Sequence, residues 1–445
     1  MSQTLARAVE AGGLAAALLL PLWFNPYAHA PFEPAKIALF RTITAAMALA
    51  WLGWRLLAWR ERRLVPAIDA GPIPASRAPG RWLVRMAVAY AGAVLLATAT
   101  SMDPRLSLWG KSDNPRGALT LVAGVIFFLL LVDVLRQPAQ VTRLVKAVIL
   151  ASVPVIVYGL AQGIGLDPLQ WITDSVSPVH ATLGRSNFLG AYLAMVAPWT
   201  LAFVVANEEP ALRRRFAIIL ALQGACLALT LARGAWIGGT VGCVGFLTVL
   251  AIGWRERRLW LAAGIALAAG CGVLAAMTFV ALPGGRAQAQ SAGLPYPQLR
   301  AESTLRRGII WQHALTLAPA RWLLGYGPAT FERIFSERYP PGTLYQGADA
   351  VVDDPHNLLI ERQLATGLVG LIAYGGIVGA FYTATLDVWR RRRGRWTEAL
   401  VAAAAASIAA YLVQALFNPD VVVLTVLFWL ALATMVALAR MEAPV

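Results

Sequence analysis

Residues 420–440 read DVVVLTVLFWLALATMVALAR, and no charged residue stands between Asp420 and Arg440. About 20 apolar residues in a helix cross roughly 30 Å of hydrocarbon, so this stretch predicts a transmembrane helix. Similar stretches recur almost from one end of the chain to the other. The 445 residues are 58% hydrophobic and 14% charged, with a mean hydropathy of +0.62, which excludes an ordinary soluble domain. The sequence therefore predicts an all-α, polytopic membrane protein.

Hydropathy predicts about twelve transmembrane helices. They cover residues 9–28, 37–58, 82–100, 117–135, 144–165, 188–206, 215–232, 234–253, 259–282, 358–386, 397–417 and 420–440. The first stretch is interrupted by Pro21, Asn25 and Pro26 and lacks a cleavage site. We therefore expect a retained span there, and no signal peptide.

Basic residues gather in every second predicted loop. They are Arg60, Arg62, Arg63, Arg77, Arg81 and Arg85, then Arg136, Arg143 and Lys146, then Arg213, Arg214 and Arg215, then Arg255, Arg257 and Arg258, then residues 390–393 and Arg395. Cytoplasmic loops carry an excess of Lys and Arg, so these loops and both termini are expected in the cytoplasm. The alternate loops then face the periplasm or the exterior.

The largest outward loop runs over residues 283–356, between the ninth and tenth spans. Helical spacing of apolar residues predicts helices over 303–317 and 330–339, and Gly325, Gly327 and Pro328 predict a turn between them. The aromatic content of this loop favours order over disorder. We expect a small helical cap over the outer mouth, and thus three parts: residues 1–282, 283–356 and 357–445.

Composition and motifs also limit the classes of partner and cofactor that we expect. The net charge of +15 comes from arginines beside apolar spans, which is a topology signal and not a nucleic-acid-binding pattern. The three cysteines, Cys226, Cys243 and Cys271, lie in apolar runs without paired spacing, so we expect them to pack. No P-loop or nucleotide-binding glycine motif occurs. We expect no nucleic-acid partner, no cofactor and no use of ATP.

Three polar residues map to the outer ends of predicted spans. Arg185 precedes the sixth span, Arg233 lies in the short turn between the seventh and eighth, and His356 precedes the tenth. An interfacial arginine often extends toward lipid headgroups, and for Arg185 this explanation is as good as a functional one. Arg233 lies where positive charge is otherwise scarce, so a functional role is favoured. Guanidinium groups bind phosphate through two parallel hydrogen bonds and keep their charge beside hydrocarbon.

Residues 353–357 read DDPHN. A histidine at a helix start can be a simple cap, and carboxylates there can simply favour the helix dipole. Histidine is also the natural base at neutral pH, and Asp354 could hold its ring or raise its basicity. These residues leave both roles possible, and a family resemblance, given below, is the main reason to favour a catalytic role for His356. No Asp-X-Asp or His-X-X-X-His pattern occurs, so no metal site is expected.

Several motifs resemble the O-antigen ligase and O-antigen polymerase superfamily of lipid-linked glycan transferases. They are SLWG at 107–110 with RG at 116–117, YGLAQ at 158–162 with GLDP at 165–168, GRSNFLGAY at 184–192, ARGAW at 232–236, RGIIW at 307–311 with GYGPATF at 325–331, and HNLL at 356–359 with GLVG at 367–370. The resemblance rests on their order and on their spacing around one large outer loop.

The resemblance implies a membrane-type glycosyltransferase whose donor is a glycan on undecaprenyl diphosphate. It implies that Arg185 and Arg233 contact the donor diphosphate and that His356 is the family's loop histidine. Many relatives have Gly-Asn-Pro-Asn where residues 184–187 of this chain read GRSN. The candidate substrate-binding residues are Arg306, Arg307, Asp354 and Asn357, although a solvated helix face explains the two arginines slightly better. The expected reaction is metal-independent and inverts the anomeric carbon.

The sequence does not identify the acceptor of the glycan. Ligation to a lipid core, polymerisation of repeat units and transfer to a protein hydroxyl share this chemistry, and the single large loop favours the ligase by analogy. A transporter of lipid-linked glycans is the alternative from another class, but the ionisable residues lie at span ends and not at the bilayer midplane. We expect a bacterial inner-membrane protein whose partners are the lipid-linked donor, a hydroxyl acceptor and membrane lipids.

Overall fold

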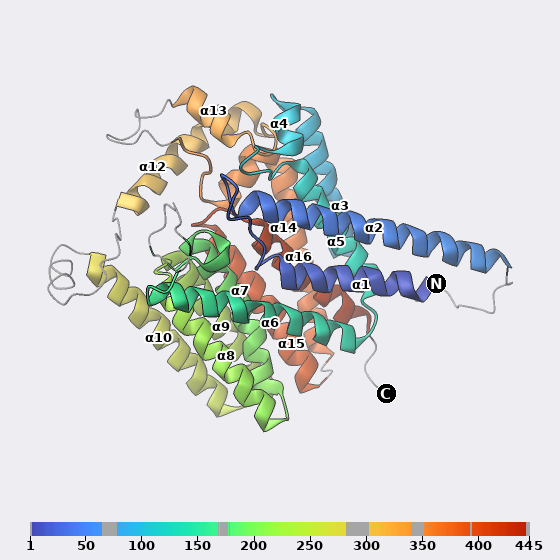
Figure 1. The fold of residues 1–445 in the computed structure, drawn as a ribbon, viewed down its shortest axis with the longest axis vertical. Helices are drawn as coiled ribbons and strands as arrows, with labels where there is room; N and C mark the ends of the chain where they lie inside the picture. Colours follow the sequence, from blue (N-terminus) through green and yellow to red (C-terminus); the bar gives the residue numbers. More distant parts are fainter. Residues whose placement is uncertain are drawn as a thin grey trace.

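The computed structural model describes residues 2–64, 78–167, 169, 177, 179–281, 302–339, 351–391 and 394–441, and over these residues the chain is all-helical without a strand. The helices are α1 (Ser2–Leu19), α2 (Glu33–Leu64), α3 (Ala78–Ala99), α4 (Pro104–Trp109), α5 (Ala118–Val134), α6 (Pro138–Gly163), η1 (Ala181–Leu183), α7 (Ser186–Ala206), α8 (Pro210–Leu229), α9 (Arg233–Trp254), α10 (Arg257–Ala281), α12 (Glu302–Leu317), η2 (Ala318–Arg321), α13 (Phe331–Arg338), α14 (Leu358–Arg390), α15 (Arg395–Ala415) and α16 (Val422–Arg440). They pack into a helical bundle, with α12 and α13 at one end (Figure 1).

Nine helices in the described part of the chain are long and apolar enough to cross a membrane. They are α2, α3, α6, α7, α9, α10, α14, α15 and α16. Each of the twelve predicted spans overlaps one helix, but α5 has 17 residues and α1 and α8 do not meet the same standard. The chain is thus a multi-pass membrane protein, and the count of twelve spans stays a prediction.

The predicted position of the first span is wrong. Hydropathy places it at 9–28, whereas α1 covers Ser2–Leu19 and the next helix begins at Glu33. A residue that precedes proline disfavours helical backbone angles, so Pro21 ends the helix although apolar residues continue beyond it. The window average includes those residues because it measures hydropathy and not backbone freedom.

The stretch at 420–440 forms α16, the most deeply buried of the spanning helices. Its apolar window has a mean hydropathy of 2.5 and is 94% buried, against 17% for α10. α16 packs against α5, α14 and α15, so each of its sides meets another helix. A helix that is apolar all round is expected in such a central place. Most of the surface of α10 is left uncovered by the other described helices.

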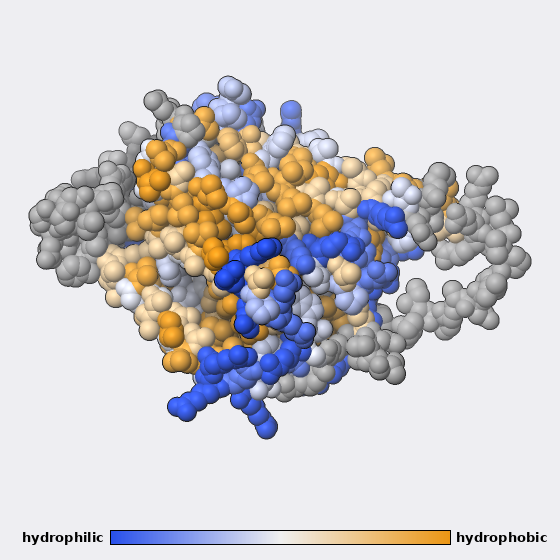
Figure 2. All heavy atoms as spheres, turned by 60° about the horizontal axis from the view of Figure 1, so that its bottom comes forward, coloured by the Kyte–Doolittle hydropathy of each residue, from blue (hydrophilic) through white to orange (hydrophobic). Residues whose placement is uncertain are grey.

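The described residues of the basic loops gather at one end of the bundle. Glu256, which follows α9, forms ion pairs with Arg258 at 2.5 Å and with Arg395 at 2.6 Å, so the end of α9 lies beside the start of α15. Figure 2 turns the lower end of Figure 1 toward the reader and shows hydrophilic side chains gathered there, with hydrophobic side chains on the adjoining surface. Because α7, α9 and α14 each precede one of these basic loops, their first residues lie at the opposite end of the bundle.

The long helix α14 is interrupted at Gly367, where φ is +62° and ψ is −166°. Four backbone hydrogen bonds join this break to the turn before α13: Tyr326 N–H to Leu364 O at 2.7 Å, Gly327 N–H to Ala365 O at 3.0 Å, Leu368 N–H to Trp322 O at 2.8 Å and Val369 N–H to Leu323 O at 3.2 Å. Backbone N–H and C=O groups that a helix break frees need such partners when they are buried. The predicted turn at residues 325–328 is confirmed, and it fixes the segment that carries α12 and α13 to α14.

The two predicted helices of the outer loop are confirmed as α12 and α13. Their apolar side chains form a small core of their own against the start of α14. It consists of Ile310, Ala314, Phe331, Phe335, Ile360 and Leu364. Residues 282–301 and 340–350 lie outside the described residues, so the proposed division at 282 and 356 stays a prediction.

We predict that Gly367→Ala destabilises the fold. An added Cβ would lie 2.3 Å from the backbone of Leu323, and the residue would keep a positive φ. Such strain costs about 3 kcal/mol or more. The melting temperature of the detergent-solubilised protein should fall by several degrees. Gly375→Ala is the matched control, because a Cβ at Gly375 on the same helix meets nothing within 4 Å. Equal melting temperatures for the two variants would contradict the close backbone approach.

Candidate functional site

The turn between α15 and α16, residues 416–421, contacts the first residues of three helices. Asn418 accepts a hydrogen bond from Asn187 at the start of α7 at 3.2 Å. A Cβ built on Gly234 at the start of α9 would lie 3.0 Å from the Asn418 amide nitrogen. Asn357, which caps α14, donates to the Leu416 carbonyl at 3.2 Å. The turn therefore holds the starts of α7, α9 and α14 together.

This arrangement brings together the segments that carry the three residues predicted from the sequence. Arg185 is the N-cap of α7, Arg233 is the first residue of α9, and His356 lies two residues before α14. The Arg185 side chain is exposed, with its guanidinium 5.9 Å from the Phe188 ring centre, whereas Arg233 and His356 are half-buried. Helix N-termini carry partial positive charge and free N–H groups. Their convergence with two arginines favours binding of an anion.

Arg307 of α12 adds a further cation beside Arg233. Burial lowers the pKa of the Arg307 guanidinium, and the nearby charge of Arg233 lowers it further. Within the described residues, no carboxylate is hydrogen-bonded to Arg307. Two like charges in a partly buried place repel each other, and an anion bound between them would relieve the repulsion. Arg306, the preceding residue, is also half-buried.

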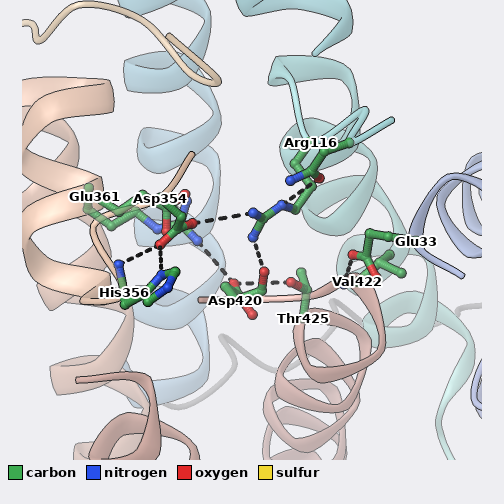
Figure 3. Close-up of polar contacts among 10 residues, drawn as sticks. Glu33, Arg116, Asp354, His356, Glu361, Asp420, Val422 and Thr425 are labelled. Carbon is green, nitrogen blue, oxygen red and sulfur yellow. Dashed lines mark hydrogen bonds and ion pairs between the residues drawn. The ribbon is translucent and has the colours of Figure 1, made fainter. Parts of the chain in front are cut away.

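His356 is held by Asp354 in an unusual backbone conformation. Its φ is +55°, in the left-handed region that non-glycine residues seldom adopt. The Asp354 carboxylate accepts the His356 backbone N–H at 2.6 Å and lies 3.4 Å from the ring Nδ1 (Figure 3). With Nδ1 directed at the carboxylate as the protonated nitrogen, Nε2 is left as the basic nitrogen. The arrangement can present a base in a fixed orientation.

Arg116 lies on the other side of the same carboxylate (Figure 3). It lies 3.3 Å from Asp354 and donates to the backbone carbonyl of Asp420. Burial by itself would raise the pKa of the Asp354 carboxyl, but hydrogen bonds from His356 and the charge of Arg116 outweigh burial and lower the pKa to about 2. Asp354 is therefore ionised at neutral pH beside His356.

Asp420 completes a buried polar network beneath the turn. Its carboxylate accepts from Tyr411 at 3.0 Å and from Thr425 at 3.2 Å, and it pairs with Arg362 at 3.2 Å. Sequence reasoning missed Asp420 and Arg362 as part of the site, and it placed Arg116 only in a resemblance motif. Asp420 could have been noticed in the sequence. The short turn between the last two predicted spans reads FNPD, which places polar residues at an apolar boundary.

The predicted cap contacts the His356 segment directly. Trp311 of α12 donates from its indole nitrogen to the Pro355 carbonyl at 2.8 Å, and its ring centre lies 6.4 Å from that of Phe417. α12 thus lies against both the histidine segment and the turn. In the parts of the chain that the structure describes, no group of three or more His, Cys, Asp or Glu side chains is placed to hold a metal ion.

Residues 216–375 match the family model described as O-antigen ligase. This match supports the resemblance to the O-antigen ligase superfamily and thus a membrane enzyme that transfers glycans. The matched range includes Arg233, Arg307, Asp354 and His356, whereas Arg185 lies outside it. Comparison with curated proteins gives no match for this chain.

We predict that Asp354→Asn lowers stability at neutral pH by about 2 kcal/mol. The pKa of Asp354 is lower in the folded protein than its usual value of 3.8, so its stabilising effect is present above that value and is lost as pH falls toward 2. The melting temperatures of the unaltered protein and of Asp354→Asn should therefore converge as pH falls from about 4 to about 2. Asp353→Asn, at the exposed neighbouring carboxylate, is the control. A difference in melting temperature that stays constant across this pH range would contradict the stabilising role of ionised Asp354.

Proposed function

We propose that this protein is a glycosyltransferase that moves a glycan from undecaprenyl diphosphate to an acceptor hydroxyl at the outer face of the inner membrane, most similar in activity to an O-antigen ligase. The observation that carries the proposal is the pair of like charges formed by Arg233, at the start of α9, and Arg307 of α12, the helix that contacts the His356 segment through Trp311. The family match over residues 216–375 supports a glycan-transferring enzyme.

The donor diphosphate binds at the starts of α7 and α9. Arg233 and Arg185 contact its phosphate oxygens, and Arg307 approaches from α12. Departure of a diphosphate leaves negative charge on its oxygens, so cations already in place lower the barrier to bond breakage. The N–H groups at the two helix starts act in the same sense. Because arginine keeps its charge beside hydrocarbon, the site can work at the membrane boundary.

His356 acts as the base toward the acceptor. The acceptor oxygen attacks the anomeric carbon, the bond from that carbon to the diphosphate oxygen breaks, and its electron pair leaves with undecaprenyl diphosphate. The hydroxyl proton passes to Nε2 of His356. Attack from the face opposite the leaving group inverts the anomeric carbon. Ionised Asp354 stabilises the imidazolium that forms, and Asn357 fixes the start of α14 behind it.

The helical cap excludes water from the reaction. Water would otherwise compete with the acceptor and hydrolyse the donor. The contact of Trp311 with Pro355 supports a cap that stays close to His356. The orientation follows from the positive-inside rule, because the basic loops lie at the end of the bundle opposite the site. We therefore place the site at the periplasmic face and both termini in the cytoplasm.

We predict that His356→Ala and Arg233→Ala each reduce transfer by at least about 100-fold, because a general base and a charge-stabilising contact each contribute at least that much. The assay uses purified protein, a glycan on undecaprenyl diphosphate, and candidate lipid, glycan and protein acceptors. Arg233→Lys should recover part of the activity, because it restores charge without the paired hydrogen bonds.

Two matched variants control for loss of fold. His29→Ala changes an exposed histidine, and Arg213→Ala changes an exposed arginine at the start of α8, at the basic end of the bundle. Both should transfer glycan at the rate of the unaltered protein. Unchanged turnover in His356→Ala and Arg233→Ala would refute the mechanism, and melting temperatures would show whether any inactive variant is still folded.

A further inference from the structure

The segment from α4 to α5 carries the family-like motif at 107–110, to which the mechanism above gives no role. An open groove of about 580 Å³ lies against it. Its lining includes Arg41, Asp103, Arg105, Trp109, Gly110 and Ser112. Its volume is that of a site for a small ligand.

The groove has an excess of positive charge. Its one carboxylate, Asp103, is already engaged, because it caps α4 by accepting from the Leu106 N–H at 3.0 Å and pairs with Arg333 at 2.9 Å. The Arg41 guanidinium is held by neutral oxygens: the carbonyls of Trp109 and Pro115 and the Thr120 hydroxyl. Arg105 is exposed and has no acidic partner among the described residues. Arg41 and Arg105 are thus left to attract an anion.

The groove also offers contacts that suit a sugar. Trp109 lines it with 55% of its surface exposed, and an indole face can stack on the apolar face of a pyranose ring. Ser112 and the backbone at Gly110 add polar groups that can bond sugar hydroxyls. An exposed tryptophan can also be a membrane-interface anchor. The cations beside it in one groove favour a ligand that is both a ring and an anion.

The groove adjoins a second cavity that reaches the candidate site. This inner cavity has a volume of about 70 Å³, and its walls include Asn114, Arg116, Glu332 and Asp354. Lys111 lines both cavities and pairs with Glu332 of α13. Asp354 therefore forms part of the cavity wall while its carboxylate is bonded to the His356 segment. A chain of polar surface leads from the groove to the group that orients the base.

We propose that this groove binds the acceptor, and that the acceptor is a glycan bearing an anionic group, a phosphate or carboxylate, near the hydroxyl that is glycosylated. The inference rests on the proposed function for the acceptor role, whereas binding of an anionic sugar is a property of the groove itself. In this arrangement the donor lies on the side of α7, α9 and Arg233, and the acceptor on the side of α4. The His356 segment lies between them.

The first test is binding of radiolabelled glucose 6-phosphate to the full-length protein in phosphatidylcholine nanodiscs by equilibrium dialysis. Arg105→Glu should weaken binding by about tenfold or more, because it reverses an exposed charge in the groove. Arg214→Glu makes the same change of charge on α8, at the basic end, and should leave binding unchanged. Trp109→Ala should also weaken binding.

The competing occupants give different results. Displacement by inorganic phosphate as effective as by unlabelled glucose 6-phosphate would overturn recognition of a sugar. Loss of binding in nanodiscs that contain phosphatidylglycerol would assign the groove to a lipid headgroup. A loss with Arg233→Ala equal to that with Arg105→Glu would place the probe at the donor site. Each of these outcomes contradicts the proposal.

The second test separates the acceptor role from the proposed function. In the transfer assay, Arg105→Glu should raise the KM for an anionic acceptor by about tenfold and leave the KM for the donor unchanged. Normal turnover with an unchanged acceptor KM would refute the acceptor role alone. Absence of product from the unaltered protein with every acceptor would refute the proposed function, and the dialysis result would then decide whether the groove binds anionic sugars.

Discussion

The bonds of one half-buried arginine hold the candidate site in place. Arg116 contacts the Asp354 carboxylate and the Asp420 carbonyl, and so ties the histidine segment before α14 to the turn before α16. The Asp354 residue is 5% exposed, so loss of Arg116 would leave its carboxylate buried without that counter-charge. The ion pair with Asp354 and the hydrogen bond to Asp420 therefore keep the histidine segment beside the turn. The same turn contacts the starts of α7 and α9 through Asn418. The position of Arg233 at the start of α9 therefore depends on the turn that Arg116 holds.

The contacts of Arg116 divide the end of the bundle opposite the basic loops into two electrostatic regions. On one side, Arg185, Arg233 and Arg307 lie near helix starts, where like charges favour a bound anion. On the other side, Asp354 is ionised and turned toward His356. A group-transfer reaction needs this contrast, because negative charge develops on the leaving group while a proton leaves the acceptor. The break at Gly367 serves the same end by anchoring the segment between α12 and α13 to α14.

Much of the fold could be predicted from the sequence, because hydropathy reports directly on burial in lipid or protein. The stretch at 420–440 is apolar on every side, and it forms the deeply buried α16. The limits of α1 could not be predicted from hydropathy, because Pro21 acts on the backbone and not on polarity. The segments of Arg233 and His356 were predicted as functional from charge at an apolar boundary and from family resemblance, and the structure brings these segments to one turn. Arg116, Asp420 and Arg362 were missed as a unit because their pairing joins residues more than 50 positions apart, and no local pattern encodes it.

The most direct test is a cryo-electron microscopy structure of the full-length protein in nanodiscs with undecaprenyl diphosphate bound. We expect density for the diphosphate at the starts of α7 and α9, within hydrogen-bond distance of Arg233 and on the same side of the membrane as His356. Diphosphate density at the basic end of the bundle, beside Arg213 or Arg255, would contradict it.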